Sequence, residues 1–325
     1  MRNIFCFLLI AVAAASCGRA IRPEALRKGD KVALVAPSYW MPDSTISKAC
    51  ECIREFGLEP VVAGNVGAQM PVSDTVNRSY YAGTPAQRAE DLLWALKDDS
   101  IKAIICTRGG YGAIQMLPKL DIRELRRHPK WIVGYSDVTA LHLACVKAGV
   151  MSIHGNMAGS LAGGGADEQG NKEMMKVLMG KRPRYDLQPS QYNINGEADG
   201  VLIGGNMITM MTLLGSDYDC IEDRGCILFL EEVGESMHAI DRLFNMLSLQ
   251  GKMKNVKGIV FGDFTDCGDE FAYESVEAML SADAAGLGIP VAFGLPAGHG
   301  ELNLPLIEGA PTTLSVTSRG ASLAQ

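Results

Sequence analysis

The chain has 325 residues, of which 47% are hydrophobic and 21% charged, and its formal net charge is −7. This length and apolar content suit about two globular domains with substantial cores. Because the chain is acidic and its Lys and Arg residues are scattered, the composition argues against a nucleic-acid partner.

The first 20 residues have the pattern of an export signal rather than of a folded element. Arg2 supplies a positive start, residues 4–14 are apolar, and a run of small residues ends at Cys17. The apolar run is too short to cross a bilayer. Its end resembles a bacterial lipoprotein processing site with Cys17 as the lipidated residue, which predicts a protein on the periplasmic side of a bacterial membrane. Ala14 stands where such sites usually carry Leu, so cleavage to a soluble protein and an uncleaved tether are the alternatives.

Strand and helix patterns alternate along the first predicted domain, residues 21–160. Strands are predicted at 31–36, 60–63, 101–107 and 131–135, and helices at 43–56, 85–97 and from 138 onward. Apolar strands alternating with helices indicate a parallel sheet that is covered on both faces.

Composition changes after Ile153, where Gly163–Gly165 and a polar stretch follow. We therefore predict a linker at 161–198 and a second domain at 199–325. Its strands are expected at 201–203, 226–230, 258–261, 291–294 and 312–316, and its helices at 207–214 and 237–249.

Cysteine spacing predicts no metal or redox site. Apart from Cys6 and Cys17 the chain has seven cysteines, so at least one is unpaired. Cys220 and Cys226 flank five residues and are candidates for a disulfide across a hairpin, whereas no C-x-x-C motif occurs. We expect neither a metal nor a cofactor.

Ser136 and Asp137 stand at the junction between a predicted strand and a predicted helix. A serine there lies at the carboxyl end of a parallel strand and at the positive end of a helix, where free N–H groups stabilise an oxyanion. The simpler interpretation is that Ser136 or Asp137 caps the helix. The turn does not match G-x-S-x-G, because Val138 replaces the second glycine.

An acid and a histidine occupy comparable strand ends in the second domain. Glu231 follows the strand at 226–230, and because side chains alternate along a strand, Glu231 and Glu232 face opposite ways and only one can serve the site. His299 lies between two glycines in a late loop, whereas His154, which follows a strand, is its competitor.

Glycine-rich turns offer candidate substrate contacts. Gly109, Gly110 and Gly112 surround Tyr111 without the spacing of a phosphate loop, so they indicate either a close backbone approach to the substrate or a plain turn. Asn206 follows two glycines and is expected to cap a helix, with a substrate contact as the weaker alternative.

In this order, the motifs resemble the serine LD-carboxypeptidase family, which includes murein tetrapeptide carboxypeptidases and immunity proteins that hydrolyse microcin C. The resemblance runs from Arg22 to Val316. It rests on Arg22-Pro23, Lys28-Gly29-Asp30, Val35–Ser38, Thr107–Gly112, Gly134–Asp137, Thr139–Leu141, Gly204–Asn206, Phe229–Glu231 with Glu235, Ile240–Arg242 and Gly298-His299.

The resemblance implies a nucleophile at Ser136, an orienting acid at Glu231 rather than Glu232, and a general base at His299. It also implies an N-terminal flavodoxin-like domain, three layers around a parallel sheet, and a smaller C-terminal swivelling β/β/α domain, with the triad assembled between them. We expect the N–H groups of Asp137 and Gly110 to hold the oxyanion, and Tyr111 and Asn206 to be substrate contacts.

The expected activity is release of terminal D-Ala from murein tetrapeptides, with a murein peptide as partner. The alternatives are an amidase of microcin C-like peptides and a non-catalytic periplasmic protein that binds wall peptides. We expect membrane contact through a lipid anchor, and the sequence leaves a homodimer open.

Overall fold

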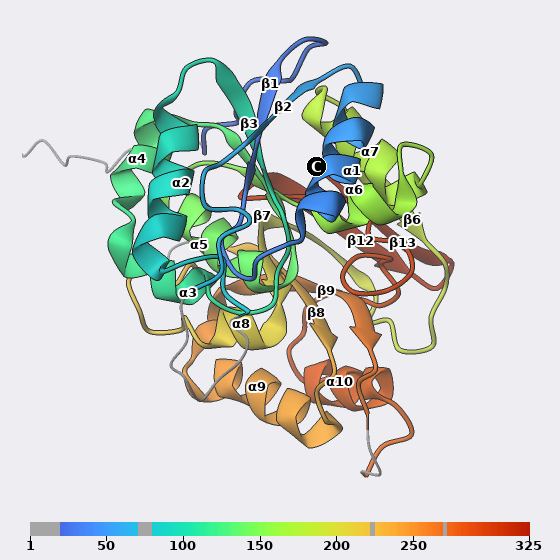
Figure 1. Ribbon diagram of the computed structural model, residues 1–325. Helices are drawn as coiled ribbons and strands as arrows, with labels where there is room; N and C mark the ends of the chain where they lie inside the picture. Colours follow the sequence, from blue (N-terminus) through green and yellow to red (C-terminus); the bar gives the residue numbers. More distant parts are fainter. Residues whose placement is uncertain (1–19, 71–79, 222–224, 269–271) are drawn as a thin grey trace, which may run out of the picture.

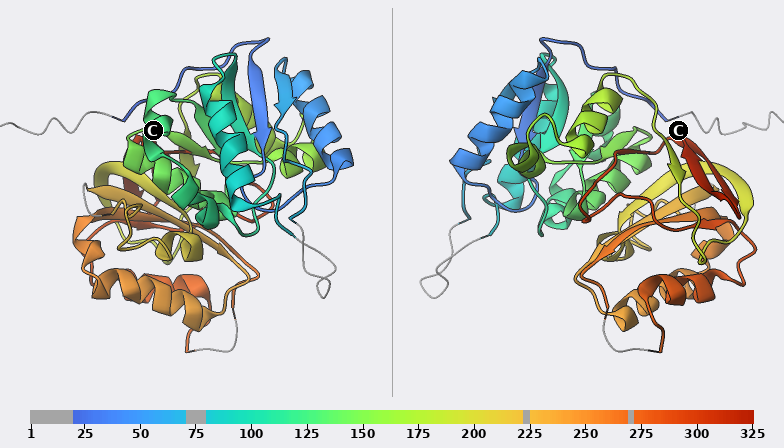
Figure 2. Two further views of the ribbon diagram at one scale, coloured as in Figure 1. Left: turned by 60° about the vertical axis from the view of Figure 1, so that its left-hand side comes forward. Right: turned by 90° about the vertical axis from the view of Figure 1, so that its right-hand side faces the viewer.

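The computed structural model describes residues 20–70, 80–221, 225–268 and 272–325, which form two sheets covered by helices (Figures 1 and 2). The predicted lipidation site Cys17, with nearly all of the predicted export signal, lies outside the described residues. Within them, no helix is both long and apolar enough to cross a membrane.

The first sheet has six strands in the order β11-β5-β4-β3-β1-β2. Five of them run parallel and β11 runs antiparallel to β5. The strands are β1 Lys31–Val35, β2 Glu59–Val62, β3 Ile101–Cys106, β4 Trp131–Gly134, β5 Ser152–His154 and β11 Leu306–Glu308. Because helices cover both faces, β1, β3 and β4 are nearly continuous apolar runs.

Helices of the first domain divide between the two faces of this sheet, as Figure 2 shows. One face carries α2 Pro85–Lys97, α3 Ala113–Met116, α4 Ile122–Arg127 and α5 Thr139–Ala148, and the other carries α1 Asp43–Glu55, α6 Ala158–Gly164 and α7 Gln169–Leu178. The bounds of α2 match the sequence prediction because Pro85 occupies its first turn and Thr84 forms a capping box with Gln87.

The second sheet has seven strands in the order β10-β9-β8-β7-β12-β13-β6. From the β10 edge inward, β10 Val291–Ala292, β9 Val256–Thr265, β8 Cys226–Val233 and β7 Gly196–Asn206 run parallel. The strands β12 Pro311–Thr317, β13 Gly320–Ala324 and β6 Arg184–Leu187 extend the sheet antiparallel. The short helix α8 Met207–Met211 follows β7, and α9 Met237–Leu249 and α10 Val276–Ala284 lie side by side on the outer face (Figure 1).

Residues 161–198, predicted as a linker, are more structured than their composition indicates. The polar segment contains α7, which buries Met174, Met175, Val177 and Leu178 at helical spacing, and the strand β6. Conversely, the late strand β11 joins the first sheet, so the chain crosses between the sheets more than once. None of the seven described cysteines forms a disulfide with another, so the predicted disulfide between Cys220 and Cys226 is wrong.

Glu308 on β11 ties the two sheets together from a fully buried position. Its Oε2 accepts a hydrogen bond of 3.0 Å from the N–H of Gly204 on β7, whereas Oε1 has no partner among the described residues. The neighbouring Gly309 N–H donates to the Leu202 carbonyl at 2.9 Å. Burial raises the pKa of Glu308 to about 8.

We expect Glu308→Gln to stabilise the protein near pH 8 but not near pH 5. The folded-state pKa lies above that of the unfolded chain, so the folded state binds the extra proton between these two values. Wild-type stability therefore falls as pH rises through this interval, by at most about 1.4 kcal/mol per pH unit from this group. Glutamine keeps the acceptor for Gly204 and does not titrate. Urea unfolding of both proteins at both pH values checks this, and parallel pH dependence of the two would contradict it.

Candidate active site

Ser136 occupies a strained corner directly after β4. It begins the short 3-10 helix η2 Ser136–Val138 with φ of +64°, a left-handed conformation that is uncommon for residues other than glycine. A Cβ on Gly109 would lie 2.9 Å from the Ser136 Cβ, and one on Gly134 would lie 2.9 Å from the Val138 side chain. Glycine at both positions therefore permits the close packing around Ser136. The Ser136 side chain makes no helix-capping hydrogen bond among the described residues.

The Asp137 side chain holds the glycine-rich loop, residues 109–112, next to Ser136 through hydrogen bonds. Its buried Oδ2 accepts hydrogen bonds from Ser38 Oγ at 2.5 Å and from the N–H of Ala113 at 2.8 Å.

Gly110 has φ of +107°, and a Cβ there would overlap the Tyr39 ring. The Gly110 N–H has no hydrogen-bond partner among the described residues. Tyr111 is 48% exposed and is not among the described residues that line the cavity discussed below, so its role as a substrate contact stays a prediction.

Glu231 and His299 are hydrogen-bonded in the structure. Glu231 Oε2 lies 2.7 Å from His299 Nδ1; the carboxylate is fully buried, and the imidazole is 18% exposed. Gly298 has φ of +129°, and a Cβ there would lie 2.6 Å from Glu231 Oε2, so only glycine permits this approach. Asn303 Oδ1 accepts from the Gly298 N–H at 3.0 Å and fixes the loop.

Carboxylates control the charge of His299. Burial alone would lower the pKa of His299, but Glu231, and to a smaller extent Glu232 and Asp263, raise it, and the result lies above the usual histidine value. Asp263, on β9, is a residue of this site that the sequence analysis does not assign to it. A Cβ on the adjacent Gly300 would lie 2.5 Å from Asp263 Oδ2, so this carboxyl packs closely under the histidine loop.

Glu232 faces away from His299, as strand alternation predicts. Its Oε1 accepts from Asn206 Nδ2 at 2.7 Å and its Oε2 from the N–H of Ile208 at 2.8 Å, at the start of α8. Asn206 Oδ1 in turn accepts from the N–H of Thr209 at 3.2 Å, so Asn206 is the N-cap of α8. Asn206 is buried and engaged in these bonds, and a direct substrate contact by it stays a prediction.

His154, the competing histidine of the sequence analysis, lies behind the site. It is fully buried at the end of β5, and its ring packs edge-on against Phe229 with centroids 4.9 Å apart. Burial lowers the pKa of His154 well below the usual value, which keeps the imidazole neutral. The Tyr135 ring contacts both histidines: its centroid lies 6.0 Å from that of His154 and 5.0 Å from that of His299.

Ser136 and His299 line the same cavity of about 370 Å³, which lies at the carboxyl ends of β3 and β4. Its other lining residues are Thr107, Arg108, Gly109, Gly110, Tyr135, Met157, Gly159 and Ser160. No hydrogen bond joins Ser136 to His299 among the described residues; such contacts are often loose before substrate binds. Arg108, Met157 and Ser160 were not assigned to the site from sequence, although the position of Arg108 after β3 was a usable signal.

No cluster of three or more His, Cys, Asp or Glu side chains in the described part of the chain is placed to hold a metal ion. The chemistry that the cavity offers is that of a serine hydroxyl, an imidazole and a buried carboxylate.

Comparison with protein families agrees with this arrangement. Residues 32–155 match the LD-carboxypeptidase N-terminal domain, and residues 199–314 match the LD-carboxypeptidase C-terminal domain. The chain belongs to the LD-carboxypeptidase family. Each of the two matched regions carries part of the site: Ser136 lies in the first, and Glu231 and His299 lie in the second.

Relatives of this LD-carboxypeptidase cover nearly its whole length. A putative carboxypeptidase of Streptomyces coelicolor is 34% identical over 90% of this chain and 93% of its own. The murein tetrapeptide carboxypeptidase of Pseudomonas aeruginosa is 29% identical over 84% of this chain and 89% of its own. The crystal structure of a muramoyltetrapeptide carboxypeptidase from Oxalobacter formigenes superposes with a TM-score of 0.80 at 25% identity, covering 90% of this chain and 98% of that one. A microcin C7 self-immunity protein of Escherichia coli is also related.

Proposed function

We propose that this LD-carboxypeptidase hydrolyses the amide between an L-centre and the terminal D-alanine of murein tetrapeptides. The observation that carries the proposal is the shared cavity of Ser136 and His299, with His299 held by the buried Glu231. The names of the Pseudomonas and Oxalobacter relatives support the choice of substrate.

In the proposed reaction Ser136 Oγ attacks the carbonyl carbon of the scissile amide while His299 Nε2 accepts the hydroxyl proton. Glu231, bound to Nδ1, fixes the tautomer of His299 and stabilises the imidazolium. The N–H groups of Gly110 and Asp137 bind the oxyanion. His299 then gives the proton to the amine of D-alanine, which leaves, and water hydrolyses the acyl-enzyme in a second cycle.

Arg108 is positioned to recognise the free carboxylate that defines a carboxypeptidase substrate. Among the described residues that line the cavity it is the one Lys or Arg, and its guanidinium lies 5.6 Å from the centroid of the Tyr39 ring. The planar guanidinium binds a carboxylate through two parallel hydrogen bonds.

We expect Arg108→Gln to raise KM for the tetrapeptide about 10- to 100-fold, because a hydrogen bond to a charged group contributes about 1.5–3 kcal/mol. Turnover should change less, since the reacting groups are untouched. The matched control is a tetrapeptide with an amidated C-terminus, on which wild type and variant should be nearly equal. Equal KM values on the free acid would contradict this role.

Incubation with defined muropeptides tests the function. Mass spectrometry should show the tetrapeptide shortened to the tripeptide, and a microcin C-like peptide cleaved much more slowly. Faster cleavage of the microcin-like peptide would favour the amidase alternative. Binding of muropeptides without turnover would identify a wall-peptide binding protein instead.

We further propose that the protein is a lipoprotein held at the periplasmic side of its membrane through Cys17. Small residues ending in a cysteine after the export signal support this proposal. Cys17→Ser should remove the protein from the membrane fraction, because stable attachment needs the acyl chains that this residue would carry. Cell fractionation measures this, and a variant that stays membrane-bound at mature size would refute the lipid anchor.

A further inference from the structure

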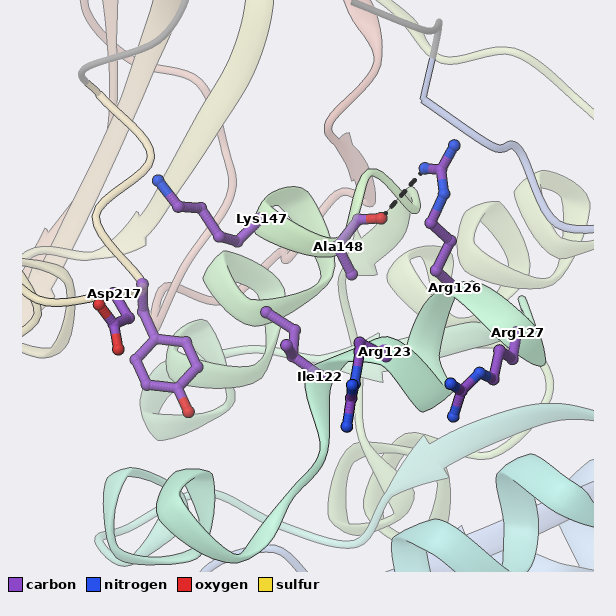
Figure 3. Close-up of a pocket in the computed structure, with 8 residues that line it drawn as sticks. Ile122, Arg123, Arg126, Arg127, Lys147, Ala148 and Asp217 are labelled. Atoms are coloured by element: carbon purple, nitrogen blue, oxygen red, sulfur yellow. Dashed lines mark hydrogen bonds between the residues drawn. The ribbon is translucent and has the colours of Figure 1, made fainter.

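A hollow of about 580 Å³ lies between α4 and the C-terminal end of α5 (Figure 3), and it shares no lining residue with the cavity of Ser136. Four cations line it, Arg123, Arg126 and Arg127 from α4 and Lys147 from α5, and we call these four residues the basic face. Ile122, Ala148 and Tyr218 supply its apolar or aromatic lining, and among the described residues Asp217 is the one acid that lines it.

Lys147 Nζ donates to the Asp219 carbonyl at 2.8 Å, so the charge available on the basic face comes mainly from its three arginines. Arg126 Nη1 donates to the backbone carbonyl of Ala148 at 3.1 Å, as Figure 3 shows, and carries no carboxylate partner among the described residues. Arg123 and Arg127 pair with carboxylates of α4 and its N-cap, but their side chains are 74% and 57% exposed. Their guanidinium groups are therefore open to a further anionic partner.

A second hollow adjoins the first, because Arg127 lines both. Counted over the part of the chain that the structure describes, the two hollows together are lined by eight Lys or Arg residues and four Asp or Glu residues. The whole chain shows the opposite balance, with 30 basic and 37 acidic residues. Positive charge is thus concentrated on this side of an acidic protein.

The chain enters the described fold on the same side. Ala20, the first described residue, lines a small hollow together with Val146 and Lys147. Ile21 is fixed there by two backbone hydrogen bonds, from its N–H to the Gly149 carbonyl at 2.8 Å and from the Met151 N–H to its own carbonyl at 2.9 Å. A segment that leads from an anchor at Cys17 therefore arrives beside the basic face.

We propose that the basic face lies against the anionic lipid headgroups of the membrane to which Cys17 anchors the protein. The proposal rests on the lipid anchor proposed above. Lys and Arg residues within a Debye length of an anionic surface are attracted to it, and the remaining acidic surface is repelled. A short tether then holds the domain in one orientation.

This orientation turns the active site away from the membrane. The ten residues of α5 span about 15 Å, with Lys147 and Ala148 at one end. Ser136 precedes the other end, so the active site and the basic face lie at opposite ends of α5.

Chemical footprinting tests the orientation. The full-length lipidated protein is placed in vesicles of phosphatidylcholine alone or with phosphatidylglycerol, and acetylation of lysines by a water-soluble reagent is followed by mass spectrometry. Lys147 should react about tenfold more slowly on the anionic vesicles. Lys254, which is exposed in the second domain, should react equally on both.

Charge variants sharpen the test. Arg123→Gln combined with Arg127→Gln should remove most of the protection of Lys147, whereas the matched control Lys257→Gln with Arg319→Gln should retain it. Thermal melts establish that both are folded. Equal reactivity of Lys147 on the two kinds of vesicle would overturn the proposal, as would equal protection by inorganic phosphate without vesicles. Failure to attach to uncharged vesicles would refute the anchor alone, and D-alanine release reports separately on the enzymatic function.

Discussion

Ser136→Ala is expected to lower kcat about a millionfold, the loss seen when the nucleophile of a serine triad is removed. The structure gives this substitution little reason to disturb folding, because alanine keeps the Cβ that Gly109 already accommodates. The left-handed backbone at this corner is as strained for alanine as for serine. Release of D-alanine and a thermal melt measure the two effects.

Ser160 provides the control for Ser136, since it is the other serine that lines the cavity. Ser160→Ala should keep activity within about tenfold of wild type, because it supplies no group to the reacting atoms. An inactive Ser160 variant beside an active Ser136 variant would show that the nucleophile has been assigned to the wrong serine.

Glu231→Gln should lower kcat about 10⁴-fold with a smaller effect on KM. The carboxylate fixes the imidazole through the 2.7 Å bond to Nδ1, and an amide in its place favours the wrong tautomer. Because glutamine has the same shape and the site is buried, the fold should persist, as circular dichroism and melting can verify.

Glu232→Gln is the neighbouring control. Glu232 binds Asn206 and the start of α8, so its amide analogue should affect stability more than turnover, with kcat within about tenfold of wild type. Both variants are assayed on one tetrapeptide. Loss of turnover at Glu232 with activity retained at Glu231 would place the orienting acid one residue later.

The sequence was a good guide to elements with strong local signals. The apolar strands β1, β3 and β4 and the capped helix α2 were predicted within a residue or two, because burial on both sheet faces and a Thr-Pro start leave clear patterns. The end of β4 marked the place of Ser136, whereas β8 continues to Val233, so Glu231 lies within the strand rather than after it. Alternation along β8 correctly predicted that Glu231 and Glu232 have different partners.

Pairing between strands that lie far apart in the chain could not be predicted from the sequence. The antiparallel addition of β11 to the first sheet depends on pairing with β5 far back in the chain, and its three residues carry no local signal for that partner. The helix α7 was missed because its apolar residues are diluted by polar ones. Arg108 and Asp263 were visible only as polar residues after strands, and their places beside the cavity and the His299 loop depend on tertiary packing.

The most direct test of the central claim uses two tetrapeptides that differ only in the configuration of the final alanine. Each is incubated with the wild-type protein and with Ser136→Ala, and the alanine released is quantified. The account predicts rapid release of D-alanine by the wild type, much slower release of L-alanine, and no measurable release by the variant. Equal release of both enantiomers, or release of D-alanine by Ser136→Ala at the wild-type rate, would contradict it.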